Sequence, residues 1–151
     1  MGPIRVLVTG ASRGIGFEIA KMCIEKGYSV LAVARDELRL SRTAISIDGL
    51  LTFKVDLTVD AEVEELVRHI ADEWGGLDVL INNAGVMPQG ERHILTCSEE
   101  DFDYTMKVNF TAPYRLTKAL LPFLQTSVSP RIINISSTMG VIGPSLSGVY
   151  G

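Results

Sequence analysis

The stretch LVTGASRGIG, residues 7–16, places three glycines directly after a run of aliphatic and β-branched residues. The apolar run predicts a buried strand over 4–8, and the residues after the glycines predict a helix. A strand, a glycine turn and a helix point helix N-terminal amides at an anion, and glycines let a pyrophosphate approach the backbone. The spacing G-x-x-x-G-x-G is neither the commonest dinucleotide fingerprint nor a Walker A loop. By itself, this glycine triplet is equally compatible with a plain tight turn.

Short apolar runs alternate with helical patterns along the rest of the chain. Further strands are predicted over 29–34, 51–55, 77–82 and 131–135. They are apolar at nearly every position, which is typical of strands buried on both faces. The clearest amphipathic helix covers 60–74, Gly27 and Gly75 are predicted to end helices, and Ser98 is predicted to cap one. This β-α-β-α order predicts an α/β fold with a parallel sheet, right-handed crossovers and helices on both faces.

Composition and charge restrict the class of protein. A chain of 151 residues, 46% hydrophobic and 21% charged, predicts one globular domain over 1–151. We expect a cytoplasmic location without a membrane anchor, because no apolar run reaches the roughly 18 residues of a membrane span. The formal net charge of −4 argues against a nucleic-acid partner. Cys23 and Cys97 lack a second Cys or a His at the spacing of metal ligands, so no metal site is predicted.

Four separate motifs carry a resemblance to a known family. They are TGASRGIG at 9–16, NNAG at 82–85, KVN at 107–109, and the pair Ser137 and Tyr150, thirteen residues apart. In order and spacing they are similar to the classical short-chain dehydrogenase/reductase family, over the whole chain. The resemblance implies a Rossmann-type, doubly wound sheet, a nicotinamide dinucleotide, and hydride transfer to or from a small-molecule carbonyl or alcohol. It also implies a homo-oligomer that packs the helix bearing Asn109 against its copy.

The resemblance further implies which residues bind the cofactor. They are Gly10, Ser12, Arg13, Gly14, Ile15, Gly16, Arg35, Asp56, Leu57, Asn83, Ala84 and Gly85. Within this set, Asp56 resembles the family's acceptor for the adenine amino group. A plain Asp at a strand end is nearly as compatible with the sequence when the family is set aside.

The choice between NAD and NADP depends on LAVARD, residues 31–36, at the end of the second predicted strand. An acid about 20 residues past the last glycine would be Asp36 and would indicate NAD. The family instead places its NAD-selecting acid at Ala34 and its NADP-selecting base at Arg35. Arg13 would lie beside the same phosphate, and two guanidiniums near one dianion form strong charge-assisted hydrogen bonds. We therefore predict NADP, with Asp36 starting a helix; the alternative is that both arginines are merely solvated.

Reduction of a ketone by hydride needs a hydrogen bond to the forming alkoxide and then a proton. By resemblance, Tyr150 is the general acid, Ser137 polarises the carbonyl, and Asn109 positions a water in a proton relay. The pKa of an unperturbed Tyr is about 10, and a nearby cation lowers it. The family supplies that cation as a Lys four residues after the Tyr, which is position 154 here. We therefore expect 1–151 to be the N-terminal part of a longer domain, inactive alone and with exposed apolar surface.

Asn109 can also be assessed without the family. Pro113 has no N–H, so the carbonyl of Asn109 is predicted to lose its helical hydrogen bond. The side chain is predicted to share a core-facing stripe with Phe102, Met106, Pro113, Leu116 and Leu120. The alternative is a satisfied core Asn at a structural kink.

Two other functions stay open at this point. The first is a catalytically silent nucleotide-binding or interaction module, which a chain without the expected Lys would suit. The second is a nucleotide-sugar epimerase of the extended branch, which is disfavoured because its glycines run G-x-x-G-x-x-G.

Overall fold

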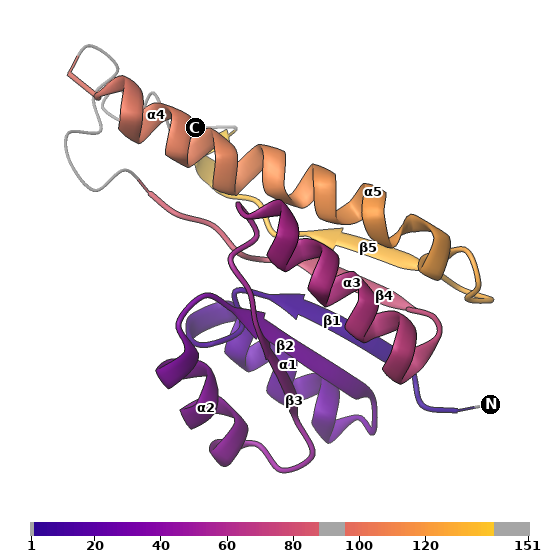
Figure 1. Cartoon of the computed structure of the whole chain (residues 1–151). Helices are drawn as coiled ribbons and strands as arrows, with labels where there is room; N and C mark the ends of the chain where they lie inside the picture. Colours follow the sequence, from indigo (N-terminus) through magenta and orange to yellow (C-terminus); the bar gives the residue numbers. More distant parts are fainter. Residues whose placement is uncertain (1, 88–95, 141–151) are drawn as a thin grey trace.

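The computed structural model describes residues 2–87 and 96–140. Its elements, in chain order, are β1 (Arg5–Thr9), α1 (Gly14–Glu25), β2 (Ser29–Ala34), α2 (Glu37–Ser46), β3 (Leu51–Lys54), α3 (Asp60–Trp74), β4 (Val79–Asn82), α4 (Glu99–Met106), η1 (Lys107–Thr111), α5 (Ala112–Leu124), β5 (Arg131–Asn134) and η2 (Thr138–Gly140). The five strands form one parallel sheet in the order β3-β2-β1-β4-β5 (Figure 1). This order confirms the predicted Rossmann-type, doubly wound α/β fold.

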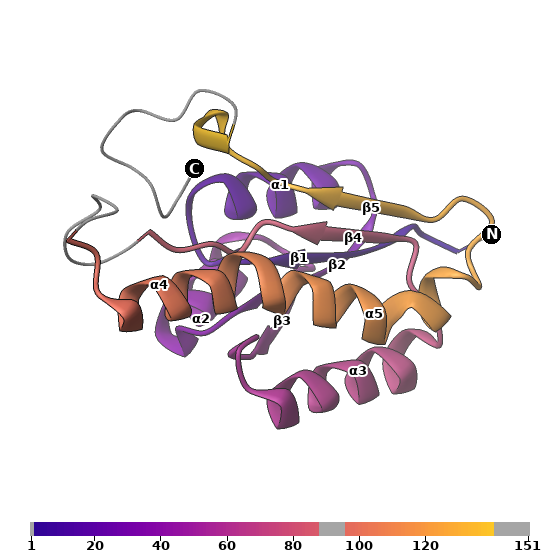
Figure 2. The same ribbon diagram turned by 90° about the horizontal axis from the view of Figure 1, so that it is seen from above.

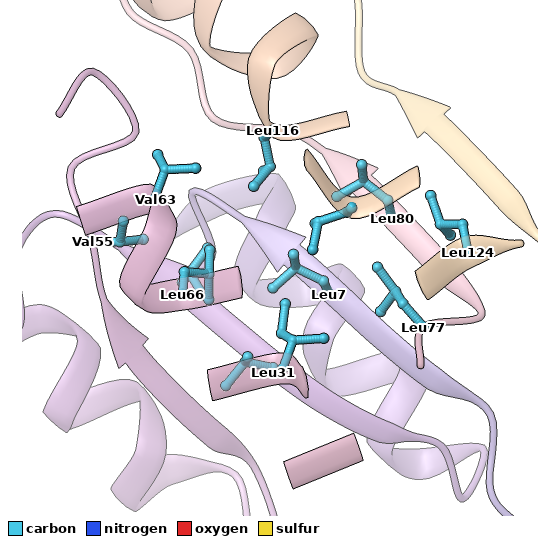
Figure 3. Packing of buried hydrophobic residues seen from close by; sticks show 12 residues of the cluster. Leu7, Leu31, Val55, Val63, Leu66, Leu77, Leu80, Leu116 and Leu124 are labelled. Carbon is cyan, nitrogen blue, oxygen red and sulfur yellow. The ribbon is translucent and has the colours of Figure 1, made fainter. Parts of the chain in front are cut away.

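The sheet separates two apolar cores, because successive strand residues point to opposite faces. On one face, Leu7 of β1 packs in a cluster with Leu66 of α3 and with side chains of α5 (Figure 3). On the other face, Val6 of β1 packs in a cluster with Ala20 of α1 and Leu40 of α2. Figure 2 shows α1 on one side of the strands and α3 and α5 on the other. Helices therefore cover both faces of the central strands, as the sequence predicts.

The two edge strands, β3 and β5, are not buried on both faces as the sequence predicted. All four residues of β5 are exposed, and β3 is buried only in part. Ile132 and Ile133 of β5 keep 43% and 42% of their surface exposed. The expectation was wrong for these strands because a run of apolar letters does not tell a central strand from an edge strand. The exposed isoleucines agree with the apolar surface expected for 1–151 alone.

The helix ends follow local signals in the sequence. Gly75 ends α3 in the left-handed conformation at φ 61°, and Gly27 follows α1 at φ 79°. The hydroxyl of Ser98 accepts a hydrogen bond from the Asp101 amide at 3.1 Å and caps α4. Among the described helices, none combines the length and apolar character that a membrane crossing requires.

The helices α4 and α5 form one continuous rod with a π-helical segment, η1, between them. In η1 the amide of Ala112 donates to the carbonyl of Lys107, five residues earlier. The π segment ends at Thr111, two residues before Pro113, which has no N–H to donate within the rod. The predicted core stripe is correct for Leu116 and Leu120 and wrong for Phe102 and Met106, which are exposed. The π segment shifts the buried face along the rod, so that Thr105 and Ala112 are buried instead.

Candidate functional site

The site lies where the chain reverses its direction across the sheet. From β1 the chain continues to β2 and β3 on one side, and it then returns to β4 and β5 on the other. In such sheets, ligands bind beyond the carboxyl ends of the strands at this switch point. A cleft of about 610 Å³ opens there. Its lining residues come from the loops after β1, β2, β3 and β4 and from the following helices.

Most of the residues that the sequence selected for the cofactor line this cleft. They are Gly10, Ser12, Arg13, Gly14, Ile15, Arg35, Asp56, Leu57, Asn83, Ala84 and Gly85. Gly16 is the exception, because it is buried behind the loop. A Cβ at Gly16 would lie 2.4 Å from Nδ2 of Asn83 and 2.7 Å from the carbonyl oxygen of Gly10. Gly16 thus serves close packing between loop and helix.

The N-terminus of α1 lies at the cleft, and no side chain among the described residues caps it. Arg13 precedes the helix and makes no side-chain cap, and the first turn contains no acidic residue. By contrast, Asp36 caps α2 and Ser98 caps α4 through side-chain oxygens. Gly14 has φ 58°, and a Cβ there would meet nothing within 4 Å. Uncapped amides, the positive end of the helix dipole and open space fit a phosphate group.

A hydrogen-bond network joins the glycine loop to the NNAG segment. The buried hydroxyl of Thr9 accepts from the amides of Asn83 at 2.9 Å and Ala84 at 3.0 Å. The side-chain amide of Asn83 donates in return to the carbonyl of Thr9 at 2.8 Å and to that of Gly10 at 3.3 Å. Sequence reasoning missed Thr9, although it opens the TGASRGIG motif. These bonds hold two loops, more than 70 residues apart in sequence, in one fixed geometry.

Asn109 fastens the far end of the NNAG loop to the helical rod. Its Oδ1 accepts from the amide of Val86 at 2.8 Å, and its Nδ2 donates to the carbonyl of Val86 at 2.9 Å. The side chain is half-buried, and both of its polar atoms are satisfied. The side chain therefore matches the alternative of a satisfied Asn at a kink. A free backbone carbonyl at Asn109 stays a prediction.

Three arginines line the cleft. Arg13 and Arg35 were expected there, whereas Arg39, in the first turn of α2, was missed. Arg35 donates to the hydroxyl of Tyr104, and its Cζ lies 6.0 Å from the centre of that ring. Arg35 therefore has a side-chain partner in Tyr104, and its contact with a 2′-phosphate stays a prediction. Asp36 also lines the cleft, where it caps α2 and pairs with Arg39.

Asp56 shapes the loop after β3. Its Oδ1 accepts from the amide of Thr58 at 2.9 Å and from the Thr58 hydroxyl at 2.7 Å. Its own amide donates to Glu62 at 2.8 Å, and that bond, together with one from Lys54, lowers the pKa of the Glu62 carboxyl. The second oxygen of Asp56, Oδ2, takes no part in these bonds. The carboxylate therefore keeps an acceptor for a ligand that lies in the cleft.

Of the residues selected for catalysis besides Asn109, the structure describes Ser137. Ser137 follows β5, which pairs with β4, and it is half-buried outside the lining of the cleft. Its Oγ accepts from the amide of Met139 at 3.2 Å, and its carbonyl accepts from Gly140 at 3.1 Å. Tyr150 lies outside the described residues. Among the described residues, no group of His, Cys, Asp and Glu could hold a metal ion.

Known proteins are similar to this chain in sequence and in fold. The chain matches the sequence profile of the short chain dehydrogenase family over residues 5–151. It is 33% identical to the (+)-neomenthol dehydrogenase of Arabidopsis thaliana, over 91% of this chain and 55% of that protein. It is 36% identical to the 3-ketodihydrosphingosine reductase of Bacteroides thetaiotaomicron, over 99% of this chain and 53% of that protein.

A solved structure of the same family is similar to this chain in fold. A short-chain dehydrogenase of Shigella flexneri, crystallised with NADP, superposes with a TM-score of 0.91 at 29% identity, over 99% of this chain and 65% of that chain. The chain spans about half the length of the curated relatives it matches. The matched profile, the sheet order and the glycine loop at the switch point together make this chain a member of the short-chain dehydrogenase/reductase family.

Proposed function

We propose that this chain is the N-terminal, NADP(H)-binding part of an oxidoreductase that reduces a small-molecule carbonyl or oxidises the corresponding alcohol. The observation that carries the proposal is the cleft, which is lined by the uncapped N-terminus of α1 and by three arginines. The relatives are named as a dehydrogenase and a ketone reductase, and the structural neighbour was crystallised with NADP. Each of these similarities supports carbonyl or alcohol chemistry.

The lining residues fit a dinucleotide by the chemistry of their groups. The loop from Gly10 to Gly14 and the first amides of α1 would hold the pyrophosphate. Asp56 would accept from the adenine amino group through Oδ2, and Arg13 and Arg35 would hold a 2′-phosphate. The remaining lining residues named above, among them Ser12, Ile15, Leu57, Ala84 and Gly85, would form the walls. Bound NADPH supplies the hydride.

The proposed chemistry on the substrate uses residues beyond the cleft. The hydroxyl of Ser137 would donate to the substrate carbonyl oxygen, and Tyr150 would then give its proton to that oxygen as the alcohol forms. The backbone carbonyl of Asn109, opposite the missing N–H of Pro113, would hold a water that returns the proton. A Lys at position 154 would lower the pKa of Tyr150, because a neighbouring cation favours the phenolate.

Calorimetric titration of the chain with NADPH and NADH tests the cofactor. We expect NADPH to bind at least about 30-fold more tightly, because a 2′-phosphate adds charge-assisted hydrogen bonds to two arginines. Equal affinities would contradict the choice of NADP, and absence of binding for both would contradict a dinucleotide site. Substrate turnover is tested with the protein that contains position 154, in which Tyr150→Phe is expected to remove ketone reduction and to leave NADPH binding unchanged.

We also propose that a second copy of this chain covers the outer face of the helical rod. Phe102, Met106, Phe110 and Tyr114 recur every four residues and are exposed, Phe110 and Tyr114 by 67% and 61%. A row of large apolar side chains on one helix face is typical of an interface between subunits. Light scattering tests this: Phe110→Asp is expected to give monomers, and the same change at exposed Arg68 on α3 is expected to leave the oligomer intact.

A further inference from the structure

We infer that Arg39 is a specificity-determining residue that makes the adenosine end of the cleft accept a 2′-phosphate. The inference rests on the proposed function and deepens it. Arg39 lies in the first turn of α2 and lines the same cleft as Arg13 and Arg35. Its side chain is about half exposed, so a ligand in the cleft can reach it.

Asp36 is the feature of this cleft that opposes a 2′-phosphate. Its carboxylate lines the cleft directly after Arg35. An unpaired carboxylate beside the adenosine ribose repels a phosphate dianion and accepts hydrogen bonds from a free 2′-hydroxyl, which favours NAD. A cleft that prefers NADP therefore needs the charge of Asp36 to be occupied by a protein group.

Arg39 supplies that group through two of its atoms. The backbone amide of Arg39 donates to Oδ1 of Asp36 at 3.0 Å. The guanidinium Nε of Arg39 lies 3.1 Å from Oδ2 of the same carboxylate. Both oxygens of Asp36 are thus engaged by one residue, and the guanidinium of Arg39 carries further N–H donors on its two Nη groups. Arg39 can therefore neutralise Asp36 and still offer donors to a phosphate.

The helix that carries Arg39 is fastened to the phosphate-binding loop. The hydroxyl of Thr43, one turn further along α2, donates to the carbonyl of Arg39 at 3.0 Å and lies 3.3 Å from the carbonyl of Ser12. Thr43 is 4% exposed. Ser12 belongs to the glycine loop, so this buried contact sets the position of α2 against the loop that carries Arg13.

The charges of the cleft agree with this role. Arg13, Arg35 and Arg39 face only two acids in the lining, Asp36 and Asp56, so the cleft is positive in a chain of net charge −4. Without Arg39 the two remaining arginines would be balanced by an unmasked Asp36 and by Asp56. The net charge at the adenosine end would then fall to zero.

The experiment measures the binding of adenosine 2′,5′-bisphosphate and adenosine 5′-monophosphate by calorimetry to the chain and its variants. These probes contain only the adenosine half of the cofactor, so they require no group beyond the cleft. We expect Arg39→Gln to weaken the bisphosphate about 5- to 30-fold, as loss of one partly screened charge-assisted contact implies, and the monophosphate less than about 2-fold. Arg42→Gln, an equal change of charge on the exposed side of α2, is the matched control and is expected to alter neither affinity.

A second variant separates masking of Asp36 from direct contact with the phosphate. Adding Asp36→Asn to Arg39→Gln is expected to restore part of the bisphosphate affinity, because Asn still caps α2 and carries no charge. The inference is overturned if Arg39→Gln leaves the ratio of the two affinities as it is in the unmodified chain, whether both probes are weakened equally or neither is. If the unmodified chain itself shows no preference for the bisphosphate, the proposed use of NADP fails as well, which is a different result.

Discussion

The two ends of the cleft are built by different kinds of interaction. At the glycine-loop end, buried Thr9 and half-buried Asn83 form a network with backbone groups of two loops. At the other end, where we propose that the adenosine binds, exposed or half-exposed side chains such as Arg35 and Arg39 carry the charge. A buried network is part of the fold, whereas exposed charges contribute little to stability. Substitutions at the first end should therefore cost folding free energy, and those at the second should change which cofactor binds.

The largest effect is expected at Gly16. A Cβ at this position would lie 2.4 Å from Asn83 Nδ2, so Gly16→Ala forces the loops apart and should lower the free energy of unfolding by about 1–3 kcal/mol. Gly14→Ala is the control, because it meets no atom within 4 Å and adds only the cost of a left-handed residue, about 1 kcal/mol. Urea unfolding measures both. Equal losses for the two variants would contradict a packing role for Gly16.

An effect of similar size is expected from Thr9→Val, which keeps the shape and removes the acceptor of two amides. The amides of Asn83 and Ala84 lose their partner, and the free energy of unfolding should fall by about 1–3 kcal/mol. The same change at Thr58, whose hydroxyl bonds to the half-exposed Asp56 at the other end, should cost less than about 1 kcal/mol. If Thr58→Val costs as much as Thr9→Val, the two ends do not differ in the way described.

Two Arg–Asp ion pairs, one mostly buried and one half exposed, should differ in how much they make stability depend on pH. Arg5 Nε lies 2.9 Å from Asp78, and both side chains are about three-quarters or more buried, whereas the Asp36–Arg39 pair is half exposed. The hydrogen bond from Arg5 holds the pKa of the Asp78 carboxyl far below its usual range. The resulting stability is present above the ordinary Asp pKa of about 3.9 and is lost as pH falls toward the lowered folded-state pKa.

Asp78→Asn should therefore lower the free energy of unfolding at pH 7 by about 1–3 kcal/mol and flatten its decline below about pH 4. Asp36→Asn should change stability at pH 7 by less than about 0.5 kcal/mol, because Asn also caps a helix. Chemical unfolding at several pH values measures both variants. An undiminished acid slope in Asp78→Asn would show that other carboxylates cause it.

The smallest effect on stability, and the largest on cofactor choice, is expected from Arg13→Gln combined with Arg35→Gln. Both side chains are exposed, so unfolding should change by less than about 0.5 kcal/mol. The preference for NADPH over NADH should fall at least about 30-fold, since two charge-assisted contacts are lost. Calorimetry with both cofactors measures the ratio. An unchanged ratio would exclude these arginines as the 2′-phosphate site.

Local sequence patterns predicted the helices and strands well, because helices, strands and caps depend mainly on residues that are neighbours in the sequence. The helix over 60–74 and the strand over 29–34 have the predicted bounds, and the structure confirms the cap at Ser98. The prediction was wrong where burial depends on position in the sheet, as for the exposed strand β5. It was also wrong for Phe102, because the π segment η1 rotates the face of the rod that meets the core.

The sequence by itself determined the fold class, the glycine loop and the family resemblance, because strand and helix periodicities and the spacing of motifs are properties of the chain alone. Only the tertiary structure decided which side chains meet across the switch point. It joined Thr9 to Asn83, tied Asn109 to Val86, and masked Asp36 with Arg39 in a cleft that also holds Arg13. The strand order β3-β2-β1-β4-β5 brings these loops together, and contacts over such distances leave no local signal in the sequence.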